Sequence, residues 1–114
     1  MERRRGGRPA AQPEPDAFAA LADPTRRLLL ERLAAGECTV TELTEGLSVS
    51  QAAVSQHLRL LRGTGLVEVR QDGRFRRYRL RPEGFAAFRD WLTAIERFWT
   101  ERVAALDAYL EEER

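Results

Sequence analysis

The last third of the chain carries an apolar pattern that one long helix satisfies. From Pro82 to about Glu112 the large apolar residues recur at steps of three and four, the period of an α-helix. A helix of about 30 residues is about 45 Å long. The core of a chain of 114 residues cannot cover such a helix. The sequence therefore predicts a helix whose apolar face needs a partner helix.

The simplest partner is the same helix of a second copy of the chain. The alternative is that Trp91, Phe98 and Trp99 fill the core of a monomer. We favour the homodimer because the aromatic residues continue past the point that the other predicted elements can reach. The predicted dimer interface comprises Phe18, Leu21, Phe88, Trp91, Leu92, Ile95, Phe98, Trp99, Leu106 and Tyr109.

Two helices are predicted from cap signals near the start of the chain. Asp16 can cap a short helix that carries Phe18 and Leu21 inward. Asp23-Pro24 is typical of an N-cap followed by proline at the first helical position, and Gly36 ends a helix over residues 25–35. Its expected buried residues are Leu28, Leu29 and Leu33, with Leu30 as a further candidate.

A pair of helices joined by a tight connection follows. The first is short, covers residues 41–47 and turns Leu43 and Leu47 inward. Ser50 caps the second, over residues 51–62, and Gly63-Thr64-Gly65 ends it. Its buried residues, at helical spacing, are Val54, Leu58 and Leu61.

A β-hairpin is predicted next, with strands over residues 66–70 and 74–80 around the turn signal Asp72-Gly73. Alternation places one set of side chains on a common face: Val67, Val69, Tyr78 and Leu80. The opposite set then points away: Arg70, Arg77 and Arg79.

The formal net charge of +1 conceals a strong segregation of charge. Residues 50–81 hold eight arginines and two acidic residues, a net +6, whereas residues 16–49 and 82–114 carry −3 and −4. All 19 basic residues of the chain are arginine. A basic block inside an otherwise acidic chain is the electrostatic pattern expected for nucleic-acid binding, although a solvated charged surface is the commoner origin of charge runs.

Two helices with a tight turn and then an arginine-rich hairpin predict a mainly α fold with a small β-hairpin, a winged helix-turn-helix with a long C-terminal dimerisation helix. Glutamine, serine and alanine can read base edges in the major groove; the expected base-reading residues are Gln51, Ala52, Ser55 and Gln56. The expected phosphate-binding residues are Ser50, Arg59, Arg62, Arg70, Arg74, Arg76 and Arg77.

These motifs resemble the ArsR/SmtB family of bacterial winged-helix repressors. Residues 18–28 (FAALADPTRRL) are similar to its opening signature, and residues 50–61 (SQAAVSQHLRLL) followed by Gly65-Leu66-Val67 to its recognition helix. Gly73-Arg74 and then Tyr78-Arg79-Leu80 are similar to its wing. The resemblance covers residues 16–110 and implies a homodimeric repressor that binds a double-stranded DNA operator with inverted repeats.

The chain departs from this family at its metal ligands. Metal-sensing members often carry Cys-Val-Cys-Asp-Leu in the short third helix, where residues 39–43 read Thr-Val-Thr-Glu-Leu. Others use Asp and His on the C-terminal helix, which here has Asp90 and Asp107 but no His. The single histidine, His57, matches a structural or DNA-adjacent position. We therefore expect no metal and no cofactor.

Other classes of function fit less well. No nucleophile–base pair and no glycine-rich phosphate loop is present, so an enzyme is not expected. One cysteine, Cys38, excludes an internal disulfide. No apolar run is long enough for a transmembrane helix or signal peptide, which predicts a cytoplasmic protein. Open alternatives are a regulator responsive to an unknown small-molecule effector or to thiol oxidation, and a protein-interaction module without DNA binding.

The expected organisation has three parts. Residues 1–15 are rich in Arg, Gly and Pro and predict a disordered basic tail. Residues 16–81 form the expected DNA-binding domain, and residues 82–114 the dimerisation helix.

Overall fold

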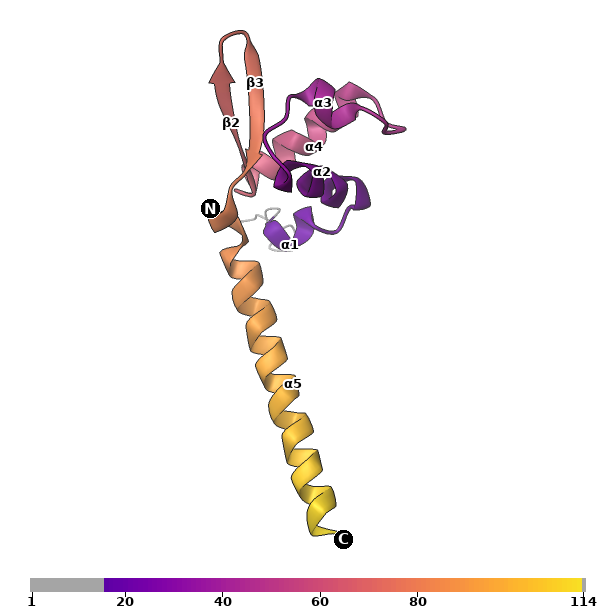
Figure 1. Ribbon diagram of the computed structural model, residues 1–114, viewed down its shortest axis with the longest axis vertical. Helices are drawn as coiled ribbons and strands as arrows, with labels where there is room; N and C mark the ends of the chain where they lie inside the picture. Colours follow the sequence, from indigo (N-terminus) through magenta and orange to yellow (C-terminus); the bar gives the residue numbers. More distant parts are fainter. Residues whose placement is uncertain (1–15, 114) are drawn as a thin grey trace, which may run out of the picture.

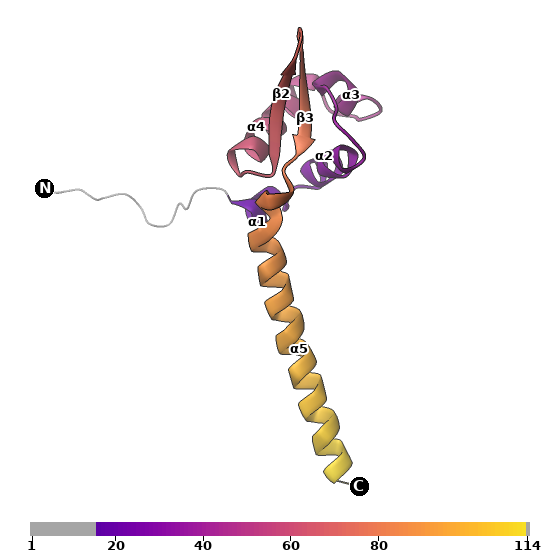
Figure 2. The same cartoon turned by 60° about the vertical axis from the view of Figure 1, so that its left-hand side comes forward.

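The computed structural model describes residues 16–113, so the expected disordered tail lies outside the described residues. Helices and a hairpin form a small head, from which the last helix extends as an arm (Figures 1 and 2). The elements in chain order are α1 (Ala17–Ala20), α2 (Pro24–Ala34), α3 (Val40–Thr44), α4 (Gln51–Gly63), β2 (Val67–Asp72), β3 (Phe75–Leu80), the 3-10 helix η1 (Pro82–Phe85) and α5 (Ala86–Glu112). The mainly α fold with one hairpin and a long C-terminal helix is confirmed.

Polar side chains cap the four helices of the head. The Asp16 carboxylate accepts from the Ala19 N–H at 2.9 Å, and the Asp23 carboxylate accepts from the N–H groups of Thr25 and Arg26 at 2.8 and 3.2 Å. Ser50 Oγ accepts from the Ala53 N–H at 3.1 Å. These three predicted N-caps are confirmed.

The predicted start of the third helix is wrong by one residue. Thr39 is its N-cap: Thr39 Oγ1 accepts from the Glu42 N–H at 3.2 Å, while the Glu42 carboxylate accepts from the Thr39 N–H at 2.8 Å. This reciprocal capping box starts the helix at Val40. The helix ends at Thr44 rather than at residue 47, and Gly46 follows at a φ of +77°.

The Asp23 cap makes part of the stability dependent on pH. The hydrogen bonds from the Arg26 and Thr25 N–H groups lower the pKa of Asp23 below its ordinary value, so the charged carboxylate is favoured in the folded state. The stability it contributes is present above about pH 4 and is lost as the pH falls through the lowered pKa. We expect Asp23→Asn, which keeps a capping oxygen, to melt a few degrees below the wild type at pH 7. The two melting temperatures should converge in acid; a difference that stays constant down to pH 3 would contradict this origin.

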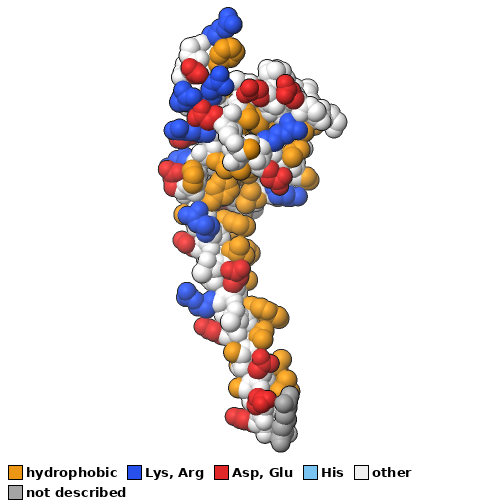
Figure 3. Space-filling view, viewed as in Figure 1, with side chains coloured by type: hydrophobic (Ala, Val, Ile, Leu, Met, Phe, Trp, Pro, Cys, Tyr) orange, Lys and Arg blue, Asp and Glu red, His pale blue; other side chains and the backbone are white. Residues whose placement is uncertain are grey.

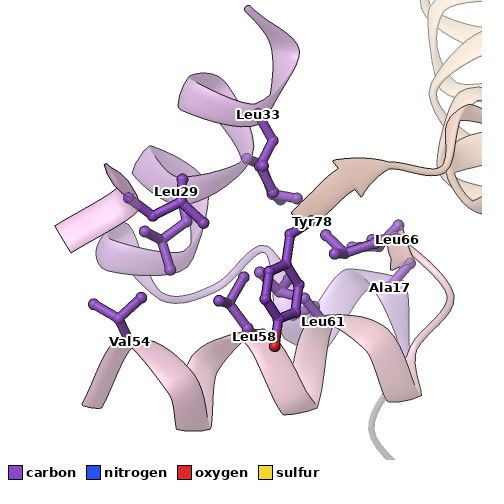
Figure 4. Packing of buried hydrophobic residues seen from close by; sticks show 12 residues of the cluster. Ala17, Leu29, Leu33, Val54, Leu58, Leu61, Leu66 and Tyr78 are labelled. Atoms are coloured by element: carbon purple, nitrogen blue, oxygen red, sulfur yellow. The ribbon is translucent and has the colours of Figure 1, made fainter. Parts of the chain in front are cut away.

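The core lies between α2, α3, α4 and the inner face of the hairpin. Figure 4 shows Val54, Leu58 and Leu61 of α4 directed toward Leu29 and Leu33 of α2. All three predicted core positions of α4 are fully buried. The remaining buried apolar residues are Ala17, Ala20, Leu30, Leu43, Leu66, Val67 and Tyr78.

Two predicted core residues lie at the surface. Leu28 is 37% exposed, and Leu30 takes its place in the core at 7%. Phe18 is 40% exposed; the small residues Ala17 and Ala20 of α1 are buried instead. The Phe18 ring lies against α5, with its centroid 5.8 Å from Phe88 and 5.7 Å from Trp91. Phe18 thus joins α1 to the base of the arm.

The side chains of the hairpin are distributed over its two faces as predicted. The antiparallel register sets Val67 opposite Leu80 and Val69 opposite Tyr78, so these four residues share the inner face as expected. Both strands begin one residue later than predicted; β2 ends two residues later, β3 ends at Leu80 as predicted, and the loop between them is Gly73-Arg74. Gly73 has a φ of +61°, a conformation that glycine adopts without strain. The backbone of Cys38 pairs with Tyr78 on the free edge of β3.

The arm leaves the head through a close backbone contact. The chain after Leu80 forms η1 before α5 begins at Ala86, so the predicted single helix from Pro82 starts with a 3-10 turn. At Gly84 an added Cβ would collide with the carbonyl group of Gly65, in the turn after α4. Glycine at residue 84 therefore lets two backbone segments touch where head and arm meet.

Candidate nucleic-acid interface

Helix α4 presents a polar face to solvent beside the hairpin. The short α3 and the turn before Ser50 hold α4 across the head, with its apolar side on the core (Figure 1). Ala52 and Gln56 are exposed and form no side-chain hydrogen bond within the described part of the chain. The exposed predicted phosphate-binding residues Arg59 and Arg62 lie toward the C-terminal end of the same helix. Small and amide side chains here allow close approach to a base-pair edge.

Gln51 has a second role that its sequence position did not reveal. Its amide nitrogen donates to Thr41 Oγ1 at 3.2 Å, so it ties the start of α4 to α3. Thr39 and Thr41 both use their hydroxyl groups within the chain. In this chain one hydroxyl caps α3 and the other holds Gln51.

Three arginines of the hairpin are neutralised by carboxylates of the same chain. They lie on its outer face, which comprises Glu68, Arg70, Asp72, Phe75, Arg77 and Arg79. Glu37 binds Arg70 at 2.6 Å and Arg79 at 3.6 Å. Asp72 binds Arg77 at 2.8 Å, and Glu68 binds Arg79 at 2.6 Å.

The ionisation of these carboxylates reflects the pairing. The hydrogen bond from Arg70 lowers the pKa of Glu37, and that from Arg77 lowers the pKa of Asp72. The same contacts raise the pKa of both guanidinium groups. These groups are exposed or partly exposed, so the pairs contribute little to stability, but they reduce the positive charge that the outer face offers to a phosphate.

The remaining predicted arginines have no acidic partner among residues 16–113. Arg59, Arg62 and Arg76, together with Ser55 and Tyr78, line a hollow of about 240 Å³ between α4 and the hairpin, hereafter the α4–hairpin hollow. Arg74, in the hairpin loop, lies over the Phe75 ring at 5.3 Å. The structure thus divides the predicted phosphate-binding arginines into a paired set on the outer face and an unpaired set beside α4.

Sequence reasoning missed Tyr78 and Glu37 as functional candidates. Alternation correctly placed Tyr78 in the core, but the residue also lines the hollow. Glu37 gave no signal, because it is 33 residues from Arg70 in the sequence.

The lone cysteine and histidine have structural environments. Burial and the nearby Glu42 charge raise the pKa of Cys38, which opposes formation of the reactive thiolate. His57 Nδ1 lies 3.4 Å from the Arg26 guanidinium. Within residues 16–113 no three side chains of the types His, Cys, Asp and Glu are grouped so as to hold a metal ion. In the same part of the chain no helix combines the length and apolarity needed to cross a membrane.

An exposed helix with small and amide residues, preceded by a tight helix-turn and followed by a basic hairpin, defines a winged helix-turn-helix DNA-binding domain. The family described as "Bacterial regulatory protein, arsR family" matches residues 23–69, from α2 into β2. The HTH-type transcriptional regulator Rv2034 of Mycobacterium tuberculosis is 46% identical over 97 residues, covering 85% of this chain and 88% of that protein.

Solved structures agree with this assignment. A structure described as a possible transcriptional regulator for arsenical resistance has a TM-score of 0.65 and 42% identity, covering 75% of this chain and 95% of its own. An ArsR-like transcriptional regulator from Rhodococcus sp. RHA1 has a TM-score of 0.65 and 36% identity, covering 78% of this chain and 84% of its own. The chain belongs to the ArsR family of bacterial transcriptional regulators.

Proposed function

We propose that this regulator is a homodimeric repressor that binds an inverted-repeat DNA operator and does not sense metal through the usual family sites. The observation that carries the proposal is the exposed face of α4, where Ala52 and Gln56 stand beside the unpaired Arg59 and Arg62. Base-reading groups flanked by free cations match the division of labour in DNA recognition, in which base contacts specify and phosphate contacts position.

The apolar face of α5 supports the dimer. Figure 3 shows hydrophobic side chains gathered along one side of the arm. Trp91, Phe98 and Trp99 are 51%, 58% and 68% exposed, so they do not fill the core of the monomer. An exposed patch of this extent is typical of an interface between protein chains. The other exposed large apolar residues of the arm are Leu92, Ile95, Val103, Leu106, Tyr109 and Leu110.

The proposed interface also includes α1. Phe18 packs on the arm through Phe88 and Trp91, so α1 lies beside the face that a second copy would cover. A twofold dimer built there presents two α4 helices. They would enter successive major grooves about 34–36 Å apart and so match an inverted repeat.

The absence of the usual metal ligands is proposed on chemical grounds. The hydroxyl groups of Thr39 and Thr41 are already engaged in the α3 cap and the contact to Gln51. A threonine hydroxyl offers no thiolate to a soft divalent metal.

Selection of bound sequences from random duplex DNA tests the function directly, because it yields both a target and its half-site spacing. An inverted repeat with its half-sites one helical turn apart supports the proposal. A wild-type protein that binds no duplex at low salt would contradict it.

Gln56→Ala should weaken binding to the selected operator more than binding to random duplex DNA. The variant loses a side chain that can bond adenine bidentately. We expect binding to the selected operator to weaken about tenfold, while binding to random duplex stays nearly unchanged. The control is Gln71→Ala in the hairpin, where the amide donates to the Gly73 carbonyl oxygen at 2.9 Å. Its ratio of specific to random affinity should equal that of the wild type. Equal losses on both duplexes for Gln56→Ala would exclude base reading by this residue.

A further inference from the structure

We propose that the α4–hairpin hollow binds one phosphate of the DNA backbone and that the Tyr78 hydroxyl is a hydrogen-bond donor to it. The inference rests on the proposed DNA-binding function and assigns a residue that alternation had placed only in the core. The hollow has a volume of about 240 Å³ and is lined by Ser55, Arg59, Arg62, Arg76 and Tyr78. It lies between the recognition helix and the hairpin.

Tyr78 combines deep burial with an unused hydroxyl. The residue is 6% exposed, and its backbone exchanges hydrogen bonds of 2.8 and 3.0 Å with Cys38. Figure 4 shows its ring passing between Leu58 and Leu61, with the hydroxyl oxygen beside α4. The hydroxyl has no hydrogen-bond partner among residues 16–113, although the residue lines the polar hollow. Because residues 16–113 supply no partner and the residue lines the hollow, its hydroxyl is available to a group supplied from outside the chain.

The charge around the hydroxyl indicates that this partner is an anion. Arg59, Arg62 and Arg76 line the same hollow without an acidic partner in the described part of the chain. The Arg76 guanidinium carbon lies 5.8 Å from the centre of the Tyr78 ring, which orients this arginine along the hollow. Three like charges close together are stabilised when an anion is bound among them. Ser55 adds a further hydroxyl to the lining of the hollow.

The location identifies the anion as a DNA phosphate. The hollow opens beside the face of α4 that carries the predicted base-reading residues, where a duplex in contact with that face places its backbone. Guanidinium groups bind phosphate oxygens through two parallel N–H donors, and a phenol adds a neutral donor. The paired arginines of the outer face, by contrast, already have carboxylate partners.

Tyr78→Phe separates this role from a structural one. The substitution keeps the buried ring and removes only the hydroxyl. We expect affinity for a random-sequence duplex at low salt to fall about fivefold to tenfold, because a hydrogen bond to a charged group is lost. The dependence of affinity on salt should stay unchanged, because the hydroxyl carries no charge. The free variant should melt at about the same temperature as the wild type, because no hydrogen bond of this hydroxyl within residues 16–113 is lost.

Arg76→Gln and Arg79→Gln form a matched pair on the two faces of β3. Arg76→Gln should reduce the slope of log affinity against log salt by about one unit, whereas Arg79→Gln should leave it nearly unchanged. If the wild type binds duplex and both Tyr78→Phe and Arg76→Gln behave like it, the phosphate site is excluded while the DNA-binding function stands. A lower melting temperature of Tyr78→Phe would show that the hydroxyl is structural and would overturn the inference.

Inorganic phosphate distinguishes a backbone site from a site for a free anion. Titration at constant ionic strength should leave the melting temperature of the free protein unchanged at millimolar phosphate. Stabilisation of the wild type but not of Tyr78→Phe would assign the hollow to a free anion and overturn its assignment to DNA.

Discussion

Trp99→Glu is expected to convert the proposed dimer to a monomer. Trp99 is 68% exposed on the apolar face of α5, and a buried unpaired carboxylate there would oppose pairing of two arms. Operator affinity should fall at least about 100-fold, because the two half-sites are no longer bound by one linked molecule. Analytical ultracentrifugation measures the oligomeric state, and titration of the selected operator measures the affinity.

Ala104→Glu is the matched control for this change. Ala104 is five residues from Trp99 and so lies about 140° away around the helix, on the side opposite Trp91 and Phe98. It receives the same charge at an exposed position of α5. This variant should remain dimeric and bind its operator. A dimeric Trp99→Glu protein, or a wild type that is monomeric at micromolar concentration, would show that the arm does not form the interface.

Arg26→Ala should produce the second large effect, a loss of about 2–4 kcal/mol in the free energy of unfolding. The Arg26 guanidinium donates to the carbonyl oxygens of Ala20 and Ala19 at 2.8 and 3.2 Å and lies 3.8 Å from the Asp23 carboxylate. It also lies beside His57 of α4, and only 15% of its side chain is exposed. It therefore joins α1, α2 and α4, and its removal takes the side-chain donor from the Ala20 carbonyl oxygen, whereas the Ala19 carbonyl oxygen keeps the Ala22 N–H at 3.1 Å.

The neighbouring Arg27 supplies the control. It is exposed, and within the described residues its side chain makes one hydrogen bond, to the Leu21 carbonyl oxygen at 2.7 Å. Arg27→Ala should cost less than about 1 kcal/mol. Urea unfolding at one fixed protein concentration compares the two variants, since dimer stability depends on concentration. Equal losses in the free energy of unfolding would show that the burial and the contacts of Arg26 do not determine its contribution to stability.

The predictable parts of the fold are those in which a local signal acts on its own neighbours. Asp23, Ser50 and Gly73 determine helix starts and a turn within a few residues, and the sequence indicates all three correctly. The capping box of Thr39 and Glu42 is equally local and could have been found from its Thr-x-x-Glu spacing.

The errors concern orientation. Leu28, Leu29 and Leu30 are consecutive, so they point over a wide arc of α2 and the sequence does not specify which of them faces solvent. Helix α1 has four residues, too few for an apolar period. Its alanines are buried, and the larger Phe18 remains outside.

The candidate interface shows the same limit. The sequence predicted a basic block, but counting charges could not separate Arg76 from Arg77. That difference arises from strand register and from Asp72, which binds Arg77 on the outer face. A residue's partner in space decides whether its charge is available to DNA.

The contact of Gly84 with Gly65 bears on which spacing of DNA half-sites the proposed dimer prefers. At this point η1, which joins α5 to the head, touches the turn after α4 through backbone atoms, with no side chain between them. In the proposed dimer, the angle between the two arms would therefore determine the distance between the two α4 helices. Because the Gly84–Gly65 contact would fix the orientation of each arm relative to its head, any change in how the arms pair would change the preferred spacing between the half-sites.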